Sequence, residues 1–341
     1  MTKILYEKNV PKRIGLLTAL LNGIMVKGPT VSEISGLLNA SLKMDDILNN
    51  SKIKIHLQHD EPLLGVASSG KKGMKTINIT TIACFVAAAC GANIAKACSH
   101  STSSKSDSAD FLSVCGMDVG ISLHRKIDIL NRHHIGFFSI EDTTPKFADV
   151  YGGIFYAPHA MSFALAGLSF PVEIDALAYG VSHPNVKLSA EVLNKYHIKE
   201  ALSYSTSLDG VHYIDEVLPA GTLKICRIRD GIVEDAISSD VRNIFELKND
   251  FDCFCIQECD DKKENIAKSI GILQGKGDDD QINAICVNAA VFLLLTRKVE
   301  CLAQGFENAK KAIKNNAAWN LFLKVVEGYD GERKKIYDII K

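Results

Sequence analysis

The sequence has no marked excess of charge of either sign. Lysine and arginine total 39 against 40 aspartates and glutamates, which gives a formal net charge of -1. General nucleic-acid binders usually carry surplus positive charge, so this balance argues against such a role. The chain is 47% hydrophobic and 23% charged, which predicts a folded protein with a substantial core.

Long apolar runs are also missing. Residues 1–13 have no apolar stretch followed by small residues, so we expect no secretory signal there. The two most apolar stretches are residues 77–95 and 282–295. The first contains several Thr, Asn and Gly residues, and the second is too short to span a bilayer. We therefore expect both stretches to form buried helices.

The ten cysteines are scattered, and nothing in the sequence indicates an oxidising compartment. We therefore expect reduced thiols in a cytoplasmic protein and no disulfide framework. The segment "CFCIQEC" (residues 253–259) allows a metal-cluster interpretation. Cys-x-Cys spacing in an alternating apolar run is more typical of a strand, however, in which cysteine packs as a small hydrophobic residue.

The pattern along the chain predicts two parts. Residues 11–60 read mostly as helices, with Thr30 and Glu33 spaced as a capping box and a short strand over residues 53–58. Strand-like runs then alternate with helices, and from Glu264 the pattern is helical almost to the end. This alternation predicts an α/β fold in which helices surround a central mixed sheet, with a small N-terminal helical domain. The expected division is a helical domain of residues 1–60, joined by helices from about 145–195, and an α/β domain of residues 61–144 and 196–341.

One polar segment, residues 66–80, combines a glycine-containing loop with the start of a helix. Ser69 and Gly70 permit close backbone approach, and N–H groups at a helix N-terminus suit an anion. Lys71 and Lys72 add charge that can bind phosphate, although an ordinary turn with two solvated lysines remains an alternative. Three polar residues follow at alternating positions and would share one face of an extended segment: Thr76, Asn78 and Thr80.

A second polar segment, residues 95–110, is dense in hydroxyl groups. Six serines and one threonine lie beside Lys96 and Lys105, a combination that suits several phosphate oxygens. Ser106 or Asp107 is expected to cap the helix that follows. The alternative is a flexible serine-rich loop, although apolar helices flank the segment closely.

A third polar segment, residues 207–217, carries the adjacent acids Asp215 and Glu216. Two carboxylates in a loop can hold one or two Mg²⁺ ions, because Mg²⁺ typically takes one or two carboxylates together with substrate phosphates. The alternative is a solvated acidic pair.

Together these segments resemble the anthranilate phosphoribosyltransferase family, a branch of the nucleoside-phosphorylase-like glycosyltransferases. Residues 76–116 are similar to the family's Asn-x-Ser-Thr motif, Ala-rich helix, Lys-His-Gly-Asn-Arg motif and Ser-x-Lys-Ser-Gly-Ser-Ala-Asp run. "HYIDEV" (residues 212–217) is similar to its Gly-Leu-Asp-Glu metal motif, and residues 282–313 resemble its C-terminal Asn-Ala-Ala helix and the helix after it. The resemblance covers roughly residues 14–328.

The resemblance implies a Mg²⁺-dependent transferase, related to tryptophan biosynthesis, that moves phosphoribose from 5-phosphoribosyl pyrophosphate (PRPP) to an amine or aromatic acceptor. It also implies a homodimer formed through the helical domain. Catalysis in the family depends on neutralised leaving-group charge and an aligned acceptor more than on a nucleophile.

The resemblance assigns roles by position. Mg²⁺ would be held by Thr80, Asp215 and Glu216, the transition-state charge would be stabilised by Lys96 and Lys105, and the acceptor would meet His159, Ser162 and Phe163. PRPP would be bound by a larger set: Ser69, Gly70, Lys71, Lys72, Thr76, Asn78, Thr80, Lys96, Ser99, Ser103 and Lys105.

Departures from the family pattern are as informative as the matches. The family's Gly-Thr-Gly-Gly-Asp-Gly loop is Ser-Ser-Gly-Lys-Lys-Gly here (residues 68–73), so Lys72 replaces the acid. No arginine lies between Arg132 and Arg227, where anthranilate-binding members have one that grips the acceptor carboxylate. We therefore expect that the acceptor can be different from anthranilate and less acidic. The N-terminus also looks about one helix shorter than in the family.

Two alternatives follow from these departures. A nucleoside phosphorylase-like enzyme is one, because that sister family also has a lysine in its glycine loop. A non-catalytic or nucleic-acid-binding paralogue is the other, although the near-zero net charge argues against nucleic acid as a partner.

Overall fold

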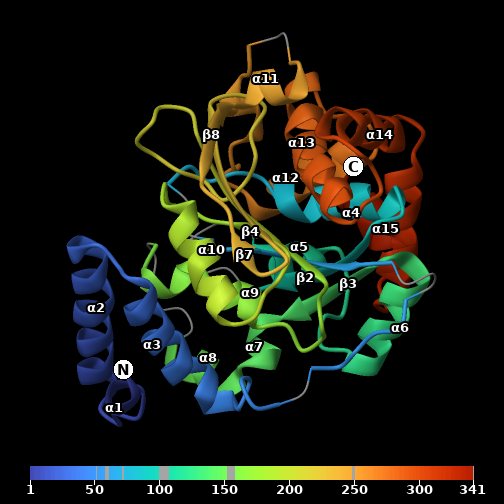
Figure 1. Ribbon diagram of the computed structural model, residues 1–341. Helices are drawn as coiled ribbons and strands as arrows, with labels where there is room; N and C mark the ends of the chain where they lie inside the picture. Colours follow the sequence, from blue (N-terminus) through green and yellow to red (C-terminus); the bar gives the residue numbers. More distant parts are fainter. Residues whose placement is uncertain are drawn as a thin grey trace.

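The computed structural model describes residues 1–50, 52–57, 61–70, 73–99, 107–151, 158–247 and 250–340. The N-terminal helices lie at one end of the molecule and the C-terminal helices at the other, with the sheet between them (Figure 1). Within the described ranges, no helix has both the length and the apolar character needed to cross a membrane.

The N-terminal part is helical, as predicted. It consists of α1 (Thr2–Leu5), α2 (Val10–Lys27) and α3 (Val31–Leu42), followed by a short 3-10 helix. The predicted capping box is confirmed: the Thr30 side chain accepts the Glu33 backbone N–H at 3.3 Å, and the Glu33 carboxylate accepts the Thr30 N–H at 3.2 Å. These two bonds satisfy donors that the first turn of a helix otherwise leaves unpaired.

The described strands form a mixed eight-stranded sheet in the order β3-β2-β1-β4-β5-β6-β7, with β8 also paired to β6. Strands β1 to β5 are parallel, and β6 to β8 are antiparallel additions. The carboxyl ends of the parallel strands therefore meet at one edge, which is where open α/β sheets bind ligands. The strands are β1 (Leu63–Ser68), β2 (Asn93–Cys98), β3 (Ile135–Ser139), β4 (Ala176–Gly180), β5 (Ala201–Ser207), β6 (Thr222–Arg229), β7 (Ile232–Val233) and β8 (Ile237–Asp240).

Helices cover the sheet. Helix α13 packs against α4 and α14, and α10 lies against β5 and β6 and contacts α3. The remaining helices are α4 (Ile79–Ala89), α5 (Ser108–Val114), α6 (Leu123–His133), α7 (Ile140–Thr143), α8 (Pro145–Tyr151), η3 (Ala160–Phe163), α9 (Leu165–Leu168), α10 (Val186–Lys195), α11 (Val241–Phe245), η4 (Cys253–Ile256), α12 (Lys262–Leu273), α13 (Asp279–Leu295), α14 (Leu302–Lys314), α15 (Ala317–Gly328) and α16 (Arg333–Ile339).

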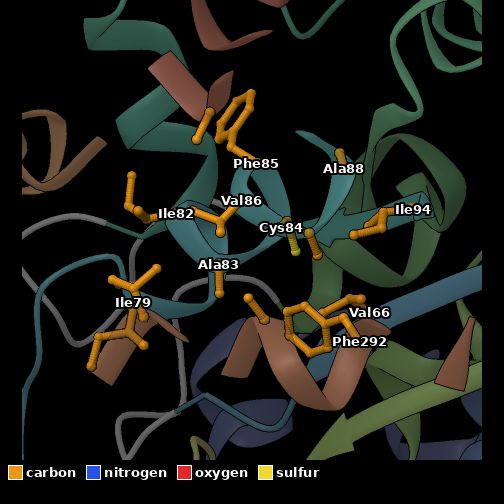
Figure 2. Close-up of a cluster of buried hydrophobic side chains, with 14 of the residues drawn as sticks. Val66, Ile79, Ile82, Ala83, Cys84, Phe85, Val86, Ala88, Ile94 and Phe292 are labelled. Atoms are coloured by element: carbon orange, nitrogen blue, oxygen red, sulfur yellow. The ribbon is translucent and has the colours of Figure 1, made fainter. Parts of the chain in front are cut away.

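The two apolar stretches form buried helices, as predicted. Figure 2 shows the core around α4, where Cys84 lies on the side of Val66, Ile94 and Phe292, which come from β1, β2 and α13, and Phe85 lies on the opposite side of the helix. Full burial of a side chain of this size contributes about 1.5–3 kcal/mol to stability. This packing holds α4 against α13 and against β2.

Two local strand predictions are wrong. Residues 253–259 contain the 3-10 helix η4, because the Asp252 side chain accepts the Phe254 N–H at 2.9 Å and starts a turn. The Phe254 side chain is also 72% exposed, so no alternating buried face forms. In the segment 53–58 the described residues contribute only a single bridge, between Ile53 and Val172.

The thiol prediction is consistent with the structure, since all ten cysteines are unpaired.

The predicted domain division stays a prediction, but one strand in the range predicted to be helical belongs to the sheet. Strand β4 lies inside the range 145–195, which the sequence pattern assigned to the helical part, yet β4 pairs with β1 and β5 in the middle of the sheet. Its burial on both faces makes its sequence a continuous apolar run, which cannot be told from a helix segment by periodicity.

Candidate active site

The Asp215–Glu216 pair lies at the carboxyl edge of the sheet. Strand β5 ends at Ser207, and the chain returns at Ile214, whose backbone N–H and C=O both bond with Thr206 at 2.9 and 3.1 Å. This return places Asp215 and Glu216 beside the strand ends, where their residues are only 2% and 3% exposed. Two adjacent buried carboxylates need hydrogen-bond donors or cations, and their burial excludes the alternative of a solvated acidic pair.

Glu216 is held by two threonine hydroxyls. The Thr76 hydroxyl donates to Glu216 Oε2 at 2.8 Å, and the Thr80 hydroxyl donates to Glu216 Oε1 at 3.2 Å. Thr80 belongs to the first turn of α4, whose positive dipole end favours a carboxylate. Asn78 is the N-cap of α4 and is 8% exposed, and its backbone N–H points to Ser269 Oγ at 3.4 Å. The structure thus brings the predicted Thr76, Asn78 and Thr80 to one place.

Asp215 faces the end of β1. Its Oδ2 accepts the Gly70 backbone N–H at 2.7 Å and lies 3.4 Å from the Ser69 hydroxyl. The Ser69 hydroxyl also accepts the Ser182 N–H at 2.8 Å, which links β1 to the loop after β4. The acidic pair is therefore joined to the predicted glycine loop through described residues; Lys71 and Lys72 of that loop lie outside them.

Gly180 makes the close approach of Asp215 possible. A Cβ atom at this position would lie 2.0 Å from the Asp215 carbonyl oxygen, so only glycine fits at the end of β4. Gly180 is not among the residues predicted from the sequence. A glycine that ends an apolar strand is a general signal of close backbone approach, and it could have pointed to this position.

Asn288 fixes the backbone directly after the acidic pair. Its Oδ1 accepts the Val217 N–H at 3.0 Å, and its Nδ2 donates to the Val217 carbonyl at 2.7 Å. Asn288 is fully buried in α13, where a polar side chain requires such partners. The sequence places this residue in a motif similar to the family's Asn-Ala-Ala helix, but it does not predict this role.

The buried charge of Asp215 affects nearby tyrosines. Burial raises the pKa of Tyr204 and of Tyr179, and in both cases the Asp215 charge raises the pKa further. Both phenols therefore stay protonated at any physiological pH.

Lys96 lies on β2 and is 4% exposed. Its ammonium donates to the neighbouring Ala97 carbonyl at 2.6 Å. The Ser99 carbonyl accepts the Ala109 N–H at 3.2 Å at the start of α5, and Asp107 is the N-cap of that helix, as predicted. Ser103, Lys105 and Ser106 lie outside the described residues, so the roles predicted for Ser103 and Lys105 stay predictions.

The predicted acceptor residues form a separate buried group. His159, Ser162 and Phe163 are 2%, 8% and 2% exposed and lie at η3, in the core between the helical part and the sheet. The Tyr179 hydroxyl donates to the Ser162 carbonyl at 2.7 Å. The Phe163 ring lies 5.0 Å from the His183 ring. This group thus meets the sheet at the end of β4, next to Gly180.

Comparisons with known proteins identify the family of the chain. The family model described as "Glycosyl transferase family, a/b domain" matches residues 60–319. The anthranilate phosphoribosyltransferase of Shewanella amazonensis is 30% identical over 319 residues, which cover 89% of this chain and 84% of the relative. That of Methanocorpusculum labreanum is 27% identical over 315 residues, covering 89% of this chain and 85% of the relative.

Solved structures show the same fold. Anthranilate phosphoribosyltransferase from Thermus thermophilus matches with a TM-score of 0.77 at 21% identity, over 97% of this chain and 93% of that one. The Saccharomyces cerevisiae enzyme in complex with PRPP and Mg matches with a TM-score of 0.76 at 18% identity, over 96% and 90%.

Fold and site thus define a glycosyltransferase with an α/β domain and an N-terminal helical part, and more narrowly a pentosyltransferase. The chain belongs to the anthranilate phosphoribosyltransferase family.

Proposed function

We propose that the protein is a Mg²⁺-dependent phosphoribosyltransferase that moves phosphoribose from PRPP to an amine or aromatic acceptor. The observation that carries this proposal is the buried Asp215–Glu216 pair, tied to the glycine loop through Gly70 and to the first turn of α4 through Thr80. The complex of the yeast relative with PRPP and Mg supports it.

The oxygen atoms at this edge suit Mg²⁺. The set consists of two carboxylates and the hydroxyls of Thr76 and Thr80, all hard oxygen donors. The described residues contain no group of three or more His, Cys, Asp or Glu side chains that could hold a metal alone. Mg²⁺ typically combines one or two carboxylates with substrate phosphates, so a two-carboxylate site fits a phosphorylated substrate. Asp215, Glu216 and Thr80 would hold the ion, which would neutralise diphosphate charge.

The reaction breaks the bond between ribose C1 and the diphosphate and forms a bond between C1 and the acceptor. Backbone N–H groups at the start of α4 and the hydroxyls of the β1 loop can bind anionic oxygens. Lys96 supplies a buried positive charge beside β1, where leaving-group charge would be stabilised. Positioning of the two substrates accounts for the remaining rate enhancement, so no nucleophilic side chain is needed.

Removal of the acidic pair tests the proposal. Asp215→Ala combined with Glu216→Ala should abolish release of diphosphate from PRPP, and Glu216→Gln should weaken it strongly. Asp235→Asn is a matched control, because this carboxylate is 95% exposed and pairs with Lys187 on the surface. Unchanged turnover in the double variant would overturn the proposal. Calorimetric titration of PRPP with and without Mg²⁺ gives a second readout. An assay with phosphate and nucleosides in place of PRPP tests for the alternative phosphorylase activity.

The finer predictions belong to this proposal as well. They include a homodimer through the helical domain, a cytoplasmic location and PRPP contacts from Lys71, Lys72, Ser103 and Lys105. Size-exclusion chromatography with light scattering tests the dimer.

A further inference from the structure

Two buried hydroxyl groups on β5 have no hydrogen-bond partner within the described part of the chain. They belong to Tyr204 and Thr206, and both residues are 0% exposed. The two residues lie two positions apart on one strand, so their side chains project from the same face of the sheet. A buried hydroxyl without a partner lowers stability, and its presence in a native structure requires an explanation.

Tyr204 shares its face of the sheet with Asp215. The register of the parallel strands pairs Tyr204 with Gly180 of β4, and residues paired in this way project toward the same face. A Cβ atom at Gly180 would lie 2.0 Å from the Asp215 carbonyl oxygen, so Asp215 lies over that face. The phenol and the first acid of the pair are therefore carried by adjacent strands on one side of the sheet.

Thr206 is linked to the acidic pair through the backbone. Its N–H donates to the Ile214 carbonyl at 3.1 Å, and its carbonyl accepts the Ile214 N–H at 2.9 Å. Ile214 directly precedes Asp215 in the chain. These two bonds hold the acidic pair beside the end of β5, where Thr206 lies.

Helix α4 covers the same side of the sheet. Cys84 lies on the side of α4 that faces β1 and β2 (Figure 2), and Thr80, one turn earlier, donates its hydroxyl to Glu216 at 3.2 Å. Tyr204 packs in the hydrophobic cluster formed around α4. Burial raises the pKa of Tyr204 first, and Asp215, Cys84 and Glu216 raise it further, so the phenol keeps its proton and remains a hydrogen-bond donor.

We propose that Tyr204 and Thr206 are positioning residues whose hydroxyls hold ordered water against Asp215 and Glu216, and that this water raises the affinity of the acidic pair for a divalent cation. This inference rests on the proposed function. Neither hydroxyl bonds to a carboxylate directly, and a hydroxyl both donates and accepts, so each can bind a bridging water. Mg²⁺ held by one or two carboxylates usually keeps several waters, which themselves need hydrogen-bond partners.

Binding of Mn²⁺ to the full chain tests this role. Mn²⁺ prefers the same oxygen ligands as Mg²⁺, and paramagnetic resonance measures its free concentration directly. The titration is made with PRPP and without an acceptor, and equal PRPP concentrations in all samples cancel the Mn²⁺ bound by free PRPP. Tyr204→Phe and Thr206→Val should each raise the Kd for Mn²⁺ about tenfold or more, because groups behind the metal ligands change metal affinity by about 10–100-fold.

Urea unfolding without metal provides a second readout on the same variants. Each substitution keeps the shape of the side chain and removes a hydroxyl that has no partner, so the urea midpoint should equal or exceed that of the wild type. A merely structural role predicts the opposite, namely a lower midpoint with unchanged Mn²⁺ binding.

Two buried hydroxyls far from the acidic pair in the sequence provide matched controls. The Tyr329 hydroxyl accepts the Phe137 N–H at 2.8 Å, and the Thr296 hydroxyl donates to the Phe292 carbonyl at 2.8 Å. Tyr329→Phe and Thr296→Val should therefore lower the urea midpoint and leave the Kd for Mn²⁺ unchanged.

Three results would overturn the inference. They are an unchanged Kd for Mn²⁺ in Tyr204→Phe and Thr206→Val, an equal rise of that Kd in the controls, and failure of both β5 variants to fold without metal. Failure of the wild type to bind Mn²⁺ in the presence of PRPP would instead contradict the proposed function.

Discussion

The side-chain amide of Asn288 pairs with both backbone groups of Val217, at 3.0 and 2.7 Å, and so fixes the chain directly after the acidic pair. Asn288→Ala would leave the Val217 N–H and C=O buried without partners. We expect the free energy of unfolding to fall by about 2–6 kcal/mol, since each of the two groups costs about 1–3 kcal/mol. Urea unfolding measures this loss, and PRPP turnover should fall with it because Glu216 is no longer held in position.

Asn283→Ala is a matched control on the same helix. Asn283 Oδ1 is buried and has no hydrogen-bond partner in the described part of the chain. Its removal should change the free energy of unfolding by less than about 1 kcal/mol. Equal losses in both variants would show that the Val217 contact is not important.

Gly180→Ala should displace the acidic pair. The new Cβ would lie 2.0 Å from the Asp215 carbonyl oxygen, and backbone cannot yield as a flexible side chain does. We expect a loss of about 1–3 kcal/mol in stability. A displacement of about 1 Å in a catalytic group can lower kcat/KM by about 100-fold, so activity should suffer more than folding.

Gly271→Ala provides the comparison for that variant. No atom lies within 4 Å of a Cβ built at Gly271 in α12. Alanine in a helix interior is favoured over glycine by about 0.5–1 kcal/mol, so this variant should be slightly more stable and fully active. Full activity in Gly180→Ala would contradict the assigned role.

Much of the fold could be predicted from local pattern. The capping box at Thr30 and Glu33 is set by side chains three residues apart, and the helices α4 and α13 by continuous apolar runs. The strand predicted over residues 253–259 failed because one side chain, Asp252, decides the backbone there. The spacing of apolar residues does not show whether such a side-chain hydrogen bond is more favourable than strand pairing.

Residue types and spacing indicated the acidic pair, Thr76, Thr80, Asn78 and the loop residues Ser69 and Gly70, and the structure brings these residues together at one edge of the sheet. The carboxylates and hydroxyls among them already indicate oxygen ligands for a metal ion. The resemblance to the family indicated which motif each residue belongs to. Gly180 matters through a contact between segments far apart in the sequence, because a Cβ at Gly180 would lie 2.0 Å from the Asp215 carbonyl oxygen. That contact depends on the pairing of β4 with β5, which the sequence alone does not specify.

Thr80→Val tests the hydroxyl contact with Glu216. Valine keeps the shape but removes the donor that lies 3.2 Å from Glu216 Oε1. Because Thr80 is proposed both to hold Mg²⁺ and to support Glu216, loss of its hydroxyl should raise the Mg²⁺ concentration needed for half-maximal turnover by about tenfold or more. Thr80→Ser keeps the hydroxyl and should restore the wild-type value. Thr81→Val makes the same change one residue further along α4 and should leave the Mg²⁺ requirement unchanged.

The pH dependence of stability should report on His183. Burial, and then the Lys224 charge, lower the pKa of His183 in the folded protein, while an unfolded chain has a histidine pKa of about 6.5. Below about pH 6.5 the unfolded chain therefore binds more protons than the folded one, so the free energy of unfolding falls as the pH is lowered. His183→Gln removes this contribution, and urea midpoints measured between about pH 7.5 and about pH 5.5 should fall less steeply than in the wild type. Lys224→Gln removes the second cause and should also flatten the slope, whereas Lys187→Gln should not; identical slopes for Lys224→Gln and the wild type would show that the Lys224 charge does not act on His183.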